Sequence, residues 1–568
     1  MKMKVVLSLL GLASACFASD LPVVDLGYEL HQAISLNDGQ STSGLYNFSN
    51  IRYAAPPLGD LRWRAPVLPK QNRTHVQTGD VGRICPQAST IWEDDIEPAF
   101  ILSLLYNTTF TKSTNISSYT YEPAKMDPRS TEDCLFLDVV VPQKIFDRAK
   151  QHSDLGNHKS FVPKNKLAPV LVWIYGGGYV GGEKSSNDPT GLIERSQVVG
   201  DGVVYVALNY RLGAFGWLSG DAIIANGTAN AALHDQRFAL DWVYKNIHLF
   251  GGDPTRITVM GESAGGGSIM HQVTAYGGNA GPSPFKQAII QSPGWVPIMD
   301  DEQPEQTLQQ FLGILNVSTI EEARNMSSEK LIAANSYQIA TKSEWGSFIY
   351  GPVVDGSFVP ELPGKLLAEG NFDRNLNIMV GHNADEGLVF TSPDSRNESG
   401  LIALLHQQFP YMKKNVSDYI SNVLYPPKYD GSYGYTSSLT RAALAISDLI
   451  FVCNTDYFNR AFHNQTFAYE FSIPPALHGQ DVSYTFYNNG SSATGSLLGV
   501  QNVTVAEVMQ DYFTSFAQCG EPSSPLGPAF HRYGQRGSLM NIGNHTISLE
   551  RDPTDNPRCR FWQTAPFT

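Results

Sequence analysis

Short apolar, β-branched runs recur along the chain, separated by polar or amphipathic stretches. The clearest runs lie at 134–142, 170–175, 203–210, 257–259, 288–292, 376–381 and 466–471. Their continuous apolar character predicts strands that are buried on both faces. Between two of them, His234 to Phe250 carries helical spacing through Phe238, Leu240, Trp242, Val243 and Ile247. Strands alternating with helices predict an α/β fold with a large, mostly parallel central sheet, covered by helices on both faces and carrying long loop insertions.

One strand, Ile257-Thr258-Val259, leads into a tight turn with Ser263 at its apex. Such a turn forces strained dihedral angles on the serine and needs small neighbours, which Gly261 and Gly265 supply. The backbone N–H of Ala264 then begins a helix and points toward the position of an oxyanion. Because G-x-S-x-G also arises by chance, a catalytic interpretation requires a base, an acid and further oxyanion donors.

A second glycine run supplies those donors. Gly176, Gly177 and Gly178 follow the strand 170–175, where backbone N–H groups face a ligand without obstruction by side chains. A flexible turn would explain three glycines equally simply. The position upstream of the serine strand favours the second half of an oxyanion hole, built from Gly177 and Gly178.

The acid and the base are expected on loops after later strands, in the order serine, acid, histidine. The strand 376–381 opens into Asp385-Glu386, and the residues alone leave these two acids close to even. His478 follows the strand 466–471 on an irregular loop, which makes it the preferred base. His531 is the runner-up. His406, His463 and His545 lie in a helical pattern or beside glycosylation motifs and are expected to play no catalytic part.

Composition narrows the class of protein. The 568 residues are 42% hydrophobic and 17% charged, which suits a large folded core, and the formal net charge of −14 disfavours nucleic acid and anionic membrane surfaces as partners. Residues 1–19 combine Lys2 and Lys4 with a short apolar stretch, as a signal peptide does. The prediction is a secreted, extracellular protein with one domain over 20–568 and no stable membrane insertion.

Glycosylation motifs agree with secretion, because many N-x-S/T sequons are expected on a glycosylated surface. The candidates are Asn47, Asn72, Asn107, Asn115, Asn226, Asn316, Asn325, Asn397, Asn415, Asn464, Asn489, Asn502 and Asn544.

Cysteine usage also fits an oxidising compartment. Once Cys16 is assigned to the leader, Cys85, Cys134, Cys453, Cys519 and Cys559 remain, an odd number that predicts two bridges and one free thiol, or an intermolecular link. Their spacing matches no zinc pattern. The long loop between Cys85 and Cys134 carries apolar clusters, and we interpret it either as a lid or wall over an apolar pocket or as a glycosylated surface excursion.

These motifs together resemble the type-B carboxylesterase/lipase family, which includes the cholinesterases and large secreted fungal lipases. The similar segments are 132–142, 173–178, 209–211, 250–265, 385–387 and 478–479. The resemblance implies an α/β-hydrolase fold, Glu386 rather than Asp385 as the acid, His478 as the base, and Gly177, Gly178 and Ala264 as oxyanion donors. It also implies bridges Cys85–Cys134 and Cys453–Cys559, with Cys519 free.

The predicted activity is hydrolysis of carboxylic esters through an acyl-enzyme on Ser263, with no metal or organic cofactor. A carboxylesterase acting on soluble esters competes with a lipase or sterol esterase whose lid is the Cys85–Cys134 loop, and with a non-catalytic binding protein on the same fold. Trp295 is a candidate for the acyl pocket, although a buried aromatic explains it equally well. Activity is expected to fall on acidification as His478 protonates, from an ordinary pKa near about 6.5. The natural ester and the oligomeric state stay open.

Overall fold

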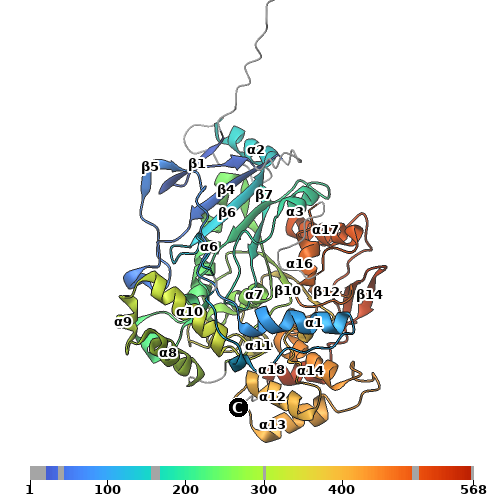
Figure 1. Ribbon diagram of the computed structural model, residues 1–568. Helices are drawn as coiled ribbons and strands as arrows, with labels where there is room; N and C mark the ends of the chain where they lie inside the picture. The colour runs from blue at the N-terminus through green and yellow to red at the C-terminus, as the bar shows by residue number, and fades with distance from the viewer. Residues whose placement is uncertain are drawn as a thin grey trace, which may run out of the picture.

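A large mixed sheet forms the centre of the protein (Figure 1). The computed structural model describes residues 21–35, 44–123, 125–154, 167–298, 302–488 and 498–564. Eleven strands pair in the order β14-β13-β12-β11-β10-β9-β7-β8-β6-β4-β3. Their bounds are β3 Ile34–Ser35, β4 Leu45–Arg52, β6 Phe136–Pro142, β7 Ala168–Ile174, β8 Val204–Leu208, β9 Gly252–Glu262, β10 Gln287–Gln291, β11 Asn377–Asn383, β12 Phe467–Phe471, β13 Ser538–Ile542 and β14 Ile547–Arg551. A second sheet joins β1 (Val23–Asp25), β2 (Glu29–Gln32) and β5 (Asn72–Gln77).

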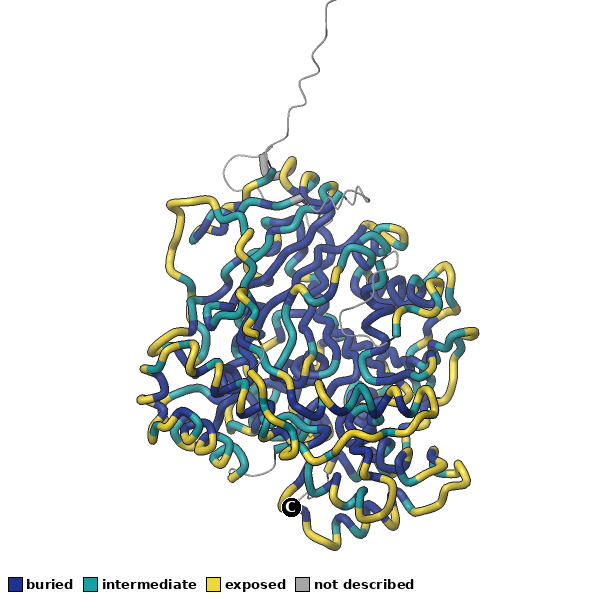
Figure 2. Tube along the Cα trace, viewed as in Figure 1, coloured by how far each residue is buried: buried dark blue, intermediate teal, exposed yellow. Residues whose placement is uncertain are grey.

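The middle of the sheet is parallel, and its two ends are antiparallel. The strands from β8 through β7, β9, β10, β11 and β12 to β13 pair in parallel, whereas β14 at one end and β6, β4 and β3 at the other pair antiparallel. Every residue of β6, β7 and β8 is buried, as the continuous apolar runs predicted. Figure 2 shows this buried layer running through the centre of the molecule.

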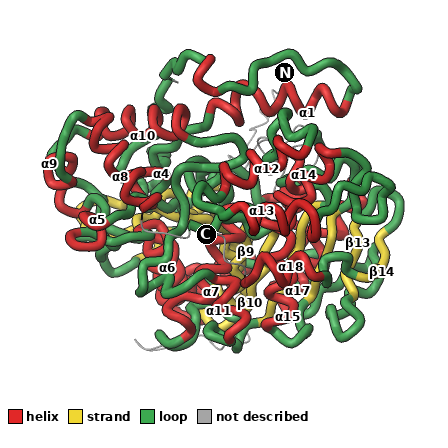
Figure 3. The backbone as a smooth tube through the Cα atoms, turned by 90° about the horizontal axis from the view of Figure 1, so that it is seen from below, coloured by secondary structure: helices red, strands yellow, loops and turns green. Residues whose placement is uncertain are grey.

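Helices cover both faces of the sheet, which confirms the predicted fold class. Helices α6 and α7 pack against β9 and against each other. Helix α17 packs against β7 and β9, and it also contacts α3 and α16. Figure 3 shows the helices enclosing the strands. The helices are α1 Glu97–Leu105, α2 Gln143–Asp154, α3 Thr190–Ser196, α4 Gly213–Trp217, α5 Asp221–Asn226, α6 Ala231–Asn246, α7 Ala264–Thr274, α8 Glu302–Leu315, α9 Ile320–Arg324, α10 Ser328–Lys342, α11 Pro363–Glu369, α12 Glu398–Gln408, α13 Lys414–Tyr419, α14 Ser438–Ser447, α15 Cys453–Ala461, α16 Gln480–Thr485, α17 Val503–Cys519 and α18 Pro557–Thr564.

Strand register brings the predicted site residues to one edge of the sheet. The last residue of β9, Glu262, pairs with Gln291 of β10, and Gln291 pairs with Gly381 of β11. Parallel strands end at the same edge, so the loops that follow β9, β11 and β12 meet there. These are the loops that carry Ser263, Glu386 and His478.

Two disulfides join segments that are distant in sequence. The structure bonds Cys85 to Cys134 and Cys453 to Cys559, the pairing that the resemblance implies, and leaves Cys519 as an exposed free thiol. Among the described residues, no helix is long and apolar enough to cross a membrane.

Candidate active site

Ser263 occupies the strained turn between β9 and α7. Its backbone angles are φ 55° and ψ −124°, a combination that non-glycine residues rarely adopt. A Cβ at Gly261 would lie 2.7 Å from the carbonyl oxygen of Ile174, and one at Gly265 would lie 2.0 Å from the same oxygen. Both neighbours therefore have to be glycine for the turn to sit this close to β7, which is the physical reason for the motif.

His478 contacts Glu386 directly. The Nδ1 atom of His478 lies 2.5 Å from Oε2 of Glu386, and the glutamate is fully buried. The neighbouring Asp385 is exposed, and its backbone bridges to Leu477 instead. Of the two acids that the sequence left open, only Glu386 reaches the imidazole.

Two further groups form hydrogen bonds to the other carboxylate oxygen of Glu386, Oε1. Ser292 Oγ donates to Oε1 over 2.6 Å, and the backbone N–H of Asn383 donates to the same oxygen over 2.5 Å. Burial alone would raise the pKa of Glu386, but the charge of His478 and these hydrogen bonds outweigh it and hold the pKa below its usual range. Sequence reasoning missed Ser292; its position at the end of strand 288–292 was the available signal.

The other imidazole nitrogen faces the residue that precedes the serine. His478 Nε2 lies 3.4 Å from Oε1 of Glu262 and has no hydrogen-bond partner among the described residues, Ser263 included. Burial opposes the charged imidazolium, yet the carboxylates of Glu262 and Glu386 raise the pKa of His478 to about 9. Burial raises the pKa of Glu262 to about 8. Catalytic hydrogen bonds often tighten only when substrate binds, so this geometry is compatible with a serine–histidine pair.

The glycine run after β7 passes beside the serine turn. Gly177 and Gly178 have φ of 100° and 59°, and a Cβ at Gly176 would lie 2.9 Å from Ser263 Cβ. The carbonyl of Gly177 accepts hydrogen bonds from the N–H groups of Val180 and Gly181, which holds this part of the glycine run in a tight turn. Ala264 is the first residue of α7, and its N–H has no acceptor within the helix.

Tyr175 and Tyr210 hold the backbone that leads into this glycine run. Their rings stack with centroids 4.4 Å apart, and the Tyr210 hydroxyl donates to the Tyr175 carbonyl over 2.8 Å. Both side chains are buried. They anchor the backbone directly before Gly176.

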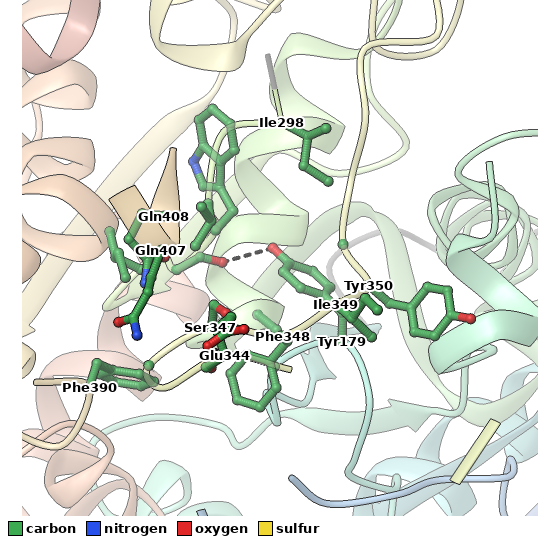
Figure 4. A pocket seen from close by; sticks show the side chains of 18 of the residues that line it. Tyr179, Ile298, Glu344, Ser347, Phe348, Ile349, Tyr350, Phe390, Gln407 and Gln408 are labelled. Carbon is green, nitrogen blue, oxygen red and sulfur yellow. Dashed lines mark hydrogen bonds between the residues drawn. The ribbon is translucent and has the colours of Figure 1, made fainter. Parts of the chain in front are cut away.

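A mostly apolar cavity of about 170 Å³ lies on one side of Ser263 (Figure 4). Ser263, Ala264 and Gly178 line it, together with Trp295, the aromatic that the sequence singled out. The Trp295 side chain is buried. The size and character of this cavity suit the acyl part of an ester.

A second, wider cavity of about 640 Å³ lies on the side of His478, Glu262 and Gly177. Glu93 and Glu97 line it as well. Burial raises the pKa of Glu93 to about 7 and that of Glu97 to about 8. The second cavity is therefore rich in carboxyl groups, in contrast to the first.

The Cys85–Cys134 loop forms a wall of the site. Trp92 in this loop lies with its ring centroid 5.6 Å from that of Phe348 and 6.1 Å from that of Phe390, and Phe390 in turn contacts the His478 ring at 5.1 Å. Phe100 and Ile101 of α1, the helix within this loop, are buried. The structure thus places the loop over the site rather than away from it.

Several candidates lie elsewhere. His463, His531 and His545 are exposed and His406 is half-buried. Residues 1–19 and Asn489 lie outside the described residues. Most other sequon asparagines are exposed, and Asn47, Asn464, Asn502 and Asn544 are half-buried. In the described part of the chain, Asp448, Cys453 and Cys559 lie close enough together to hold a metal ion. The two cysteines, however, are bonded to each other in a disulfide.

Comparison with known proteins agrees with this architecture. The chain belongs to the carboxylesterase family, whose model matches residues 34–562. It is 40% identical to the carboxylesterase PatB of Penicillium expansum over 97% of both chains, and 33% identical to a secreted lipase of Arthroderma benhamiae over 69% of this chain and 72% of that one. The solved structure of Aspergillus niger EstA superimposes with a TM-score of 0.77 at 25% identity, covering 96% of this chain and 98% of that chain. The protein is an enzyme of this family, and hydrolysis of carboxylic esters is its class of reaction.

Proposed function

We propose that the protein is a secreted carboxylic ester hydrolase in which Ser263 is the nucleophile, His478 the base and Glu386 the acid. The observation that carries the proposal is the 2.5 Å contact between His478 and the buried Glu386, next to a serine held at a strained backbone conformation. Binding alone would need neither the buried acid–histidine pair nor the strained serine. This argues against a non-catalytic binding protein.

The reaction proceeds in two steps. His478 Nε2 takes the Ser263 proton as Oγ attacks the ester carbonyl, and Glu386 fixes the tautomer and stabilises the imidazolium. The N–H groups of Gly177, Gly178 and Ala264 stabilise the oxyanion, each worth on the order of a hundredfold in rate. The imidazolium then protonates the leaving alcohol, and water activated by His478 hydrolyses the acyl-enzyme.

The two cavities hold different parts of the substrate. The acyl part occupies the smaller apolar cavity, with Trp295 in its wall, and the alcohol leaves toward the wider cavity beside His478. The chain acts as one domain over residues 20–568 after loss of residues 1–19. The exposed sequons and the paired cysteines support an extracellular location.

Hydrolysis of p-nitrophenyl esters from acetate to palmitate tests the proposal, using wild type and Ser263→Ala. The expected result is activity in the wild type and a loss of at least about a thousandfold in the variant. Thermal unfolding of both proteins shows whether the variant is folded. Equal activity of a folded Ser263→Ala protein would contradict the assignment of the nucleophile.

A lipase or sterol esterase is the second candidate, and one observation favours it. On and just after α1, within the Cys85–Cys134 loop, Leu102, Leu105 and Tyr106 are 40%, 37% and 70% exposed. An apolar strip on a wall of the site suits contact with a lipid surface. A lipase shows an optimum at long acyl chains and a rise in activity at the micelle threshold. Replacement of these three residues by serine is expected to abolish that rise. An optimum at short acyl chains without the rise identifies a soluble esterase.

A further inference from the structure

Gln408, the last residue of α12, lies in the wall of the apolar cavity beside Ser263. Its side chain is almost fully buried, with 3% of the residue exposed. Neither the amide oxygen nor the amide nitrogen has a hydrogen-bond partner among the described residues. Figure 4 shows Gln408 next to Gln407 on one side of the cavity, with Tyr179 and Ile349 on the other.

An unpaired buried amide is costly. A buried donor or acceptor without a partner destabilises the folded protein, and most such groups in folded proteins are paired. A leucine of similar volume would avoid this cost beside Phe348, Ile349 and Phe451, the apolar side chains that line the same cavity. The amide is therefore placed where a ligand can satisfy it.

A second unpaired polar atom lines the same cavity. The indole Nε1 of Trp295 is buried without a hydrogen-bond partner among the described residues, whereas the Tyr179 hydroxyl donates to the Gly294 carbonyl over 2.8 Å. Among the described residues, the buried unpaired polar groups of this lining are thus the Gln408 amide, which can donate and accept, and the Trp295 N–H, which donates. Lys342 and Glu344 also line the cavity, but both are exposed. The surrounding apolar rings lower the local dielectric, which strengthens each such hydrogen bond.

We infer that the acyl pocket selects acyl chains that carry a neutral polar group able both to donate and to accept a hydrogen bond, a hydroxyl or a carboxamide, and that Gln408 recognises that group. A carboxylate would pair with the amide N–H groups alone and would bury a charge, so the neutral group fits better. The inference rests on the proposed function, which puts the acyl chain in this cavity.

Ethyl esters of straight-chain acids from butanoate to decanoate, each compared with its ω-hydroxy and ω-carboxamide analogue, test the inference. Wild type is expected to favour the polar analogue of the matching chain length by about tenfold or more in kcat/KM, because a site built to hydrogen-bond a group rejects the analogue without it. Gln408→Leu is expected to remove that preference. Gln310→Leu, which changes an exposed glutamine of α8 that does not line the cavity, is the control and retains the preference.

Thermal unfolding gives an independent reading. Because the amide is unpaired, Gln408→Leu is expected to unfold at the same or a higher temperature than wild type. A lower unfolding temperature would mean that the amide is already satisfied, and would overturn the inference. So would a wild type that hydrolyses plain and polar esters with equal kcat/KM at every chain length. A wild type inert toward all of the esters would instead contradict the proposed function itself.

Discussion

His478 Nε2 lies 3.4 Å from the carboxylate of Glu262, on the side of the imidazole opposite to the Glu386 contact. The imidazole is therefore buried between two carboxylates, and one of them belongs to the residue directly before Ser263. Both acids favour the protonated ring, so the histidine and Glu262 titrate as a coupled pair.

The pH dependence of activity should reflect the coupled titration of His478 and Glu262. With His478 as the proposed base, catalysis needs the neutral imidazole, and the pKa of His478 is raised, so activity is expected to be lost as the pH falls through a value above the ordinary 6.5 or so. Glu262→Gln removes one negative charge and should move the acidic limb of kcat/KM to lower pH by about one unit. Glu97→Gln, which alters a carboxyl of the same cavity away from the imidazole, should leave the limb in place. An unchanged limb in Glu262→Gln would contradict the coupling.

Ser292 is predicted to be a positioning residue for the acid. Ser292→Ala removes the 2.6 Å hydrogen bond to Glu386 and should lower kcat by about tenfold, the worth of one charge-assisted bond, with little change in KM. Ser395 is also a buried serine, but its Oγ has no partner among the described residues, so Ser395→Ala serves as the control. Equal kcat values for the two variants would show that Ser292 does not support Glu386.

The serine turn should tolerate no side chain at Gly265. A Cβ there would lie 2.0 Å from the Ile174 carbonyl oxygen, so Gly265→Ala must displace backbone and should abolish measurable hydrolysis. Gly313 in α8 has open space around its Cβ position, and Gly313→Ala should stabilise the helix by about 0.5–1 kcal/mol. Urea unfolding and activity assays of both variants check the pair. Full activity in Gly265→Ala would contradict the packing described for the turn.

The buried ion pair of Arg211 and Asp235 should be a major contributor to stability. Arg211 Nε lies 2.7 Å from Asp235 Oδ2, and both residues are buried. Arg211→Met leaves the aspartate without its charge partner and should lower the free energy of unfolding by about 3–5 kcal/mol. Lys414 and Asp418 form an exposed ion pair with a similar distance between nitrogen and oxygen. Lys414→Met should change the free energy of unfolding by less than about 1 kcal/mol. Chemical denaturation distinguishes the two outcomes, and equal losses would contradict the role of burial.

Much of this architecture was readable from the sequence, because the fold imposes local requirements. The strands β6, β7 and β8 are buried on both faces and so consist almost entirely of apolar residues, with Asp138 of β6 as the charged exception. The serine turn needs glycine on both sides, which leaves a visible motif at Gly261 and Gly265. Such requirements act on neighbouring residues and therefore appear in a linear pattern.

Other parts depend on contacts between distant segments, which no local pattern records. Asp385 and Glu386 are adjacent acids, and only the direction of the chain after β11 decides which one reaches His478. Ser292 ends an ordinary apolar strand, and its role arises from a partner 94 positions away. Gln408 looks like one more polar residue in an amphipathic helix until its burial against the cavity is known.

Covalent labelling tests the central assignment most directly. Wild type and the folded variant His478→Gln are treated with an alkyl fluorophosphonate, and the modified peptide is located by mass spectrometry as a function of time. A single adduct is expected on the peptide containing Ser263, forming about a thousandfold more slowly in His478→Gln because the proposed base is missing. An adduct on another residue, or the same rate of labelling at Ser263 in both proteins, would contradict the account.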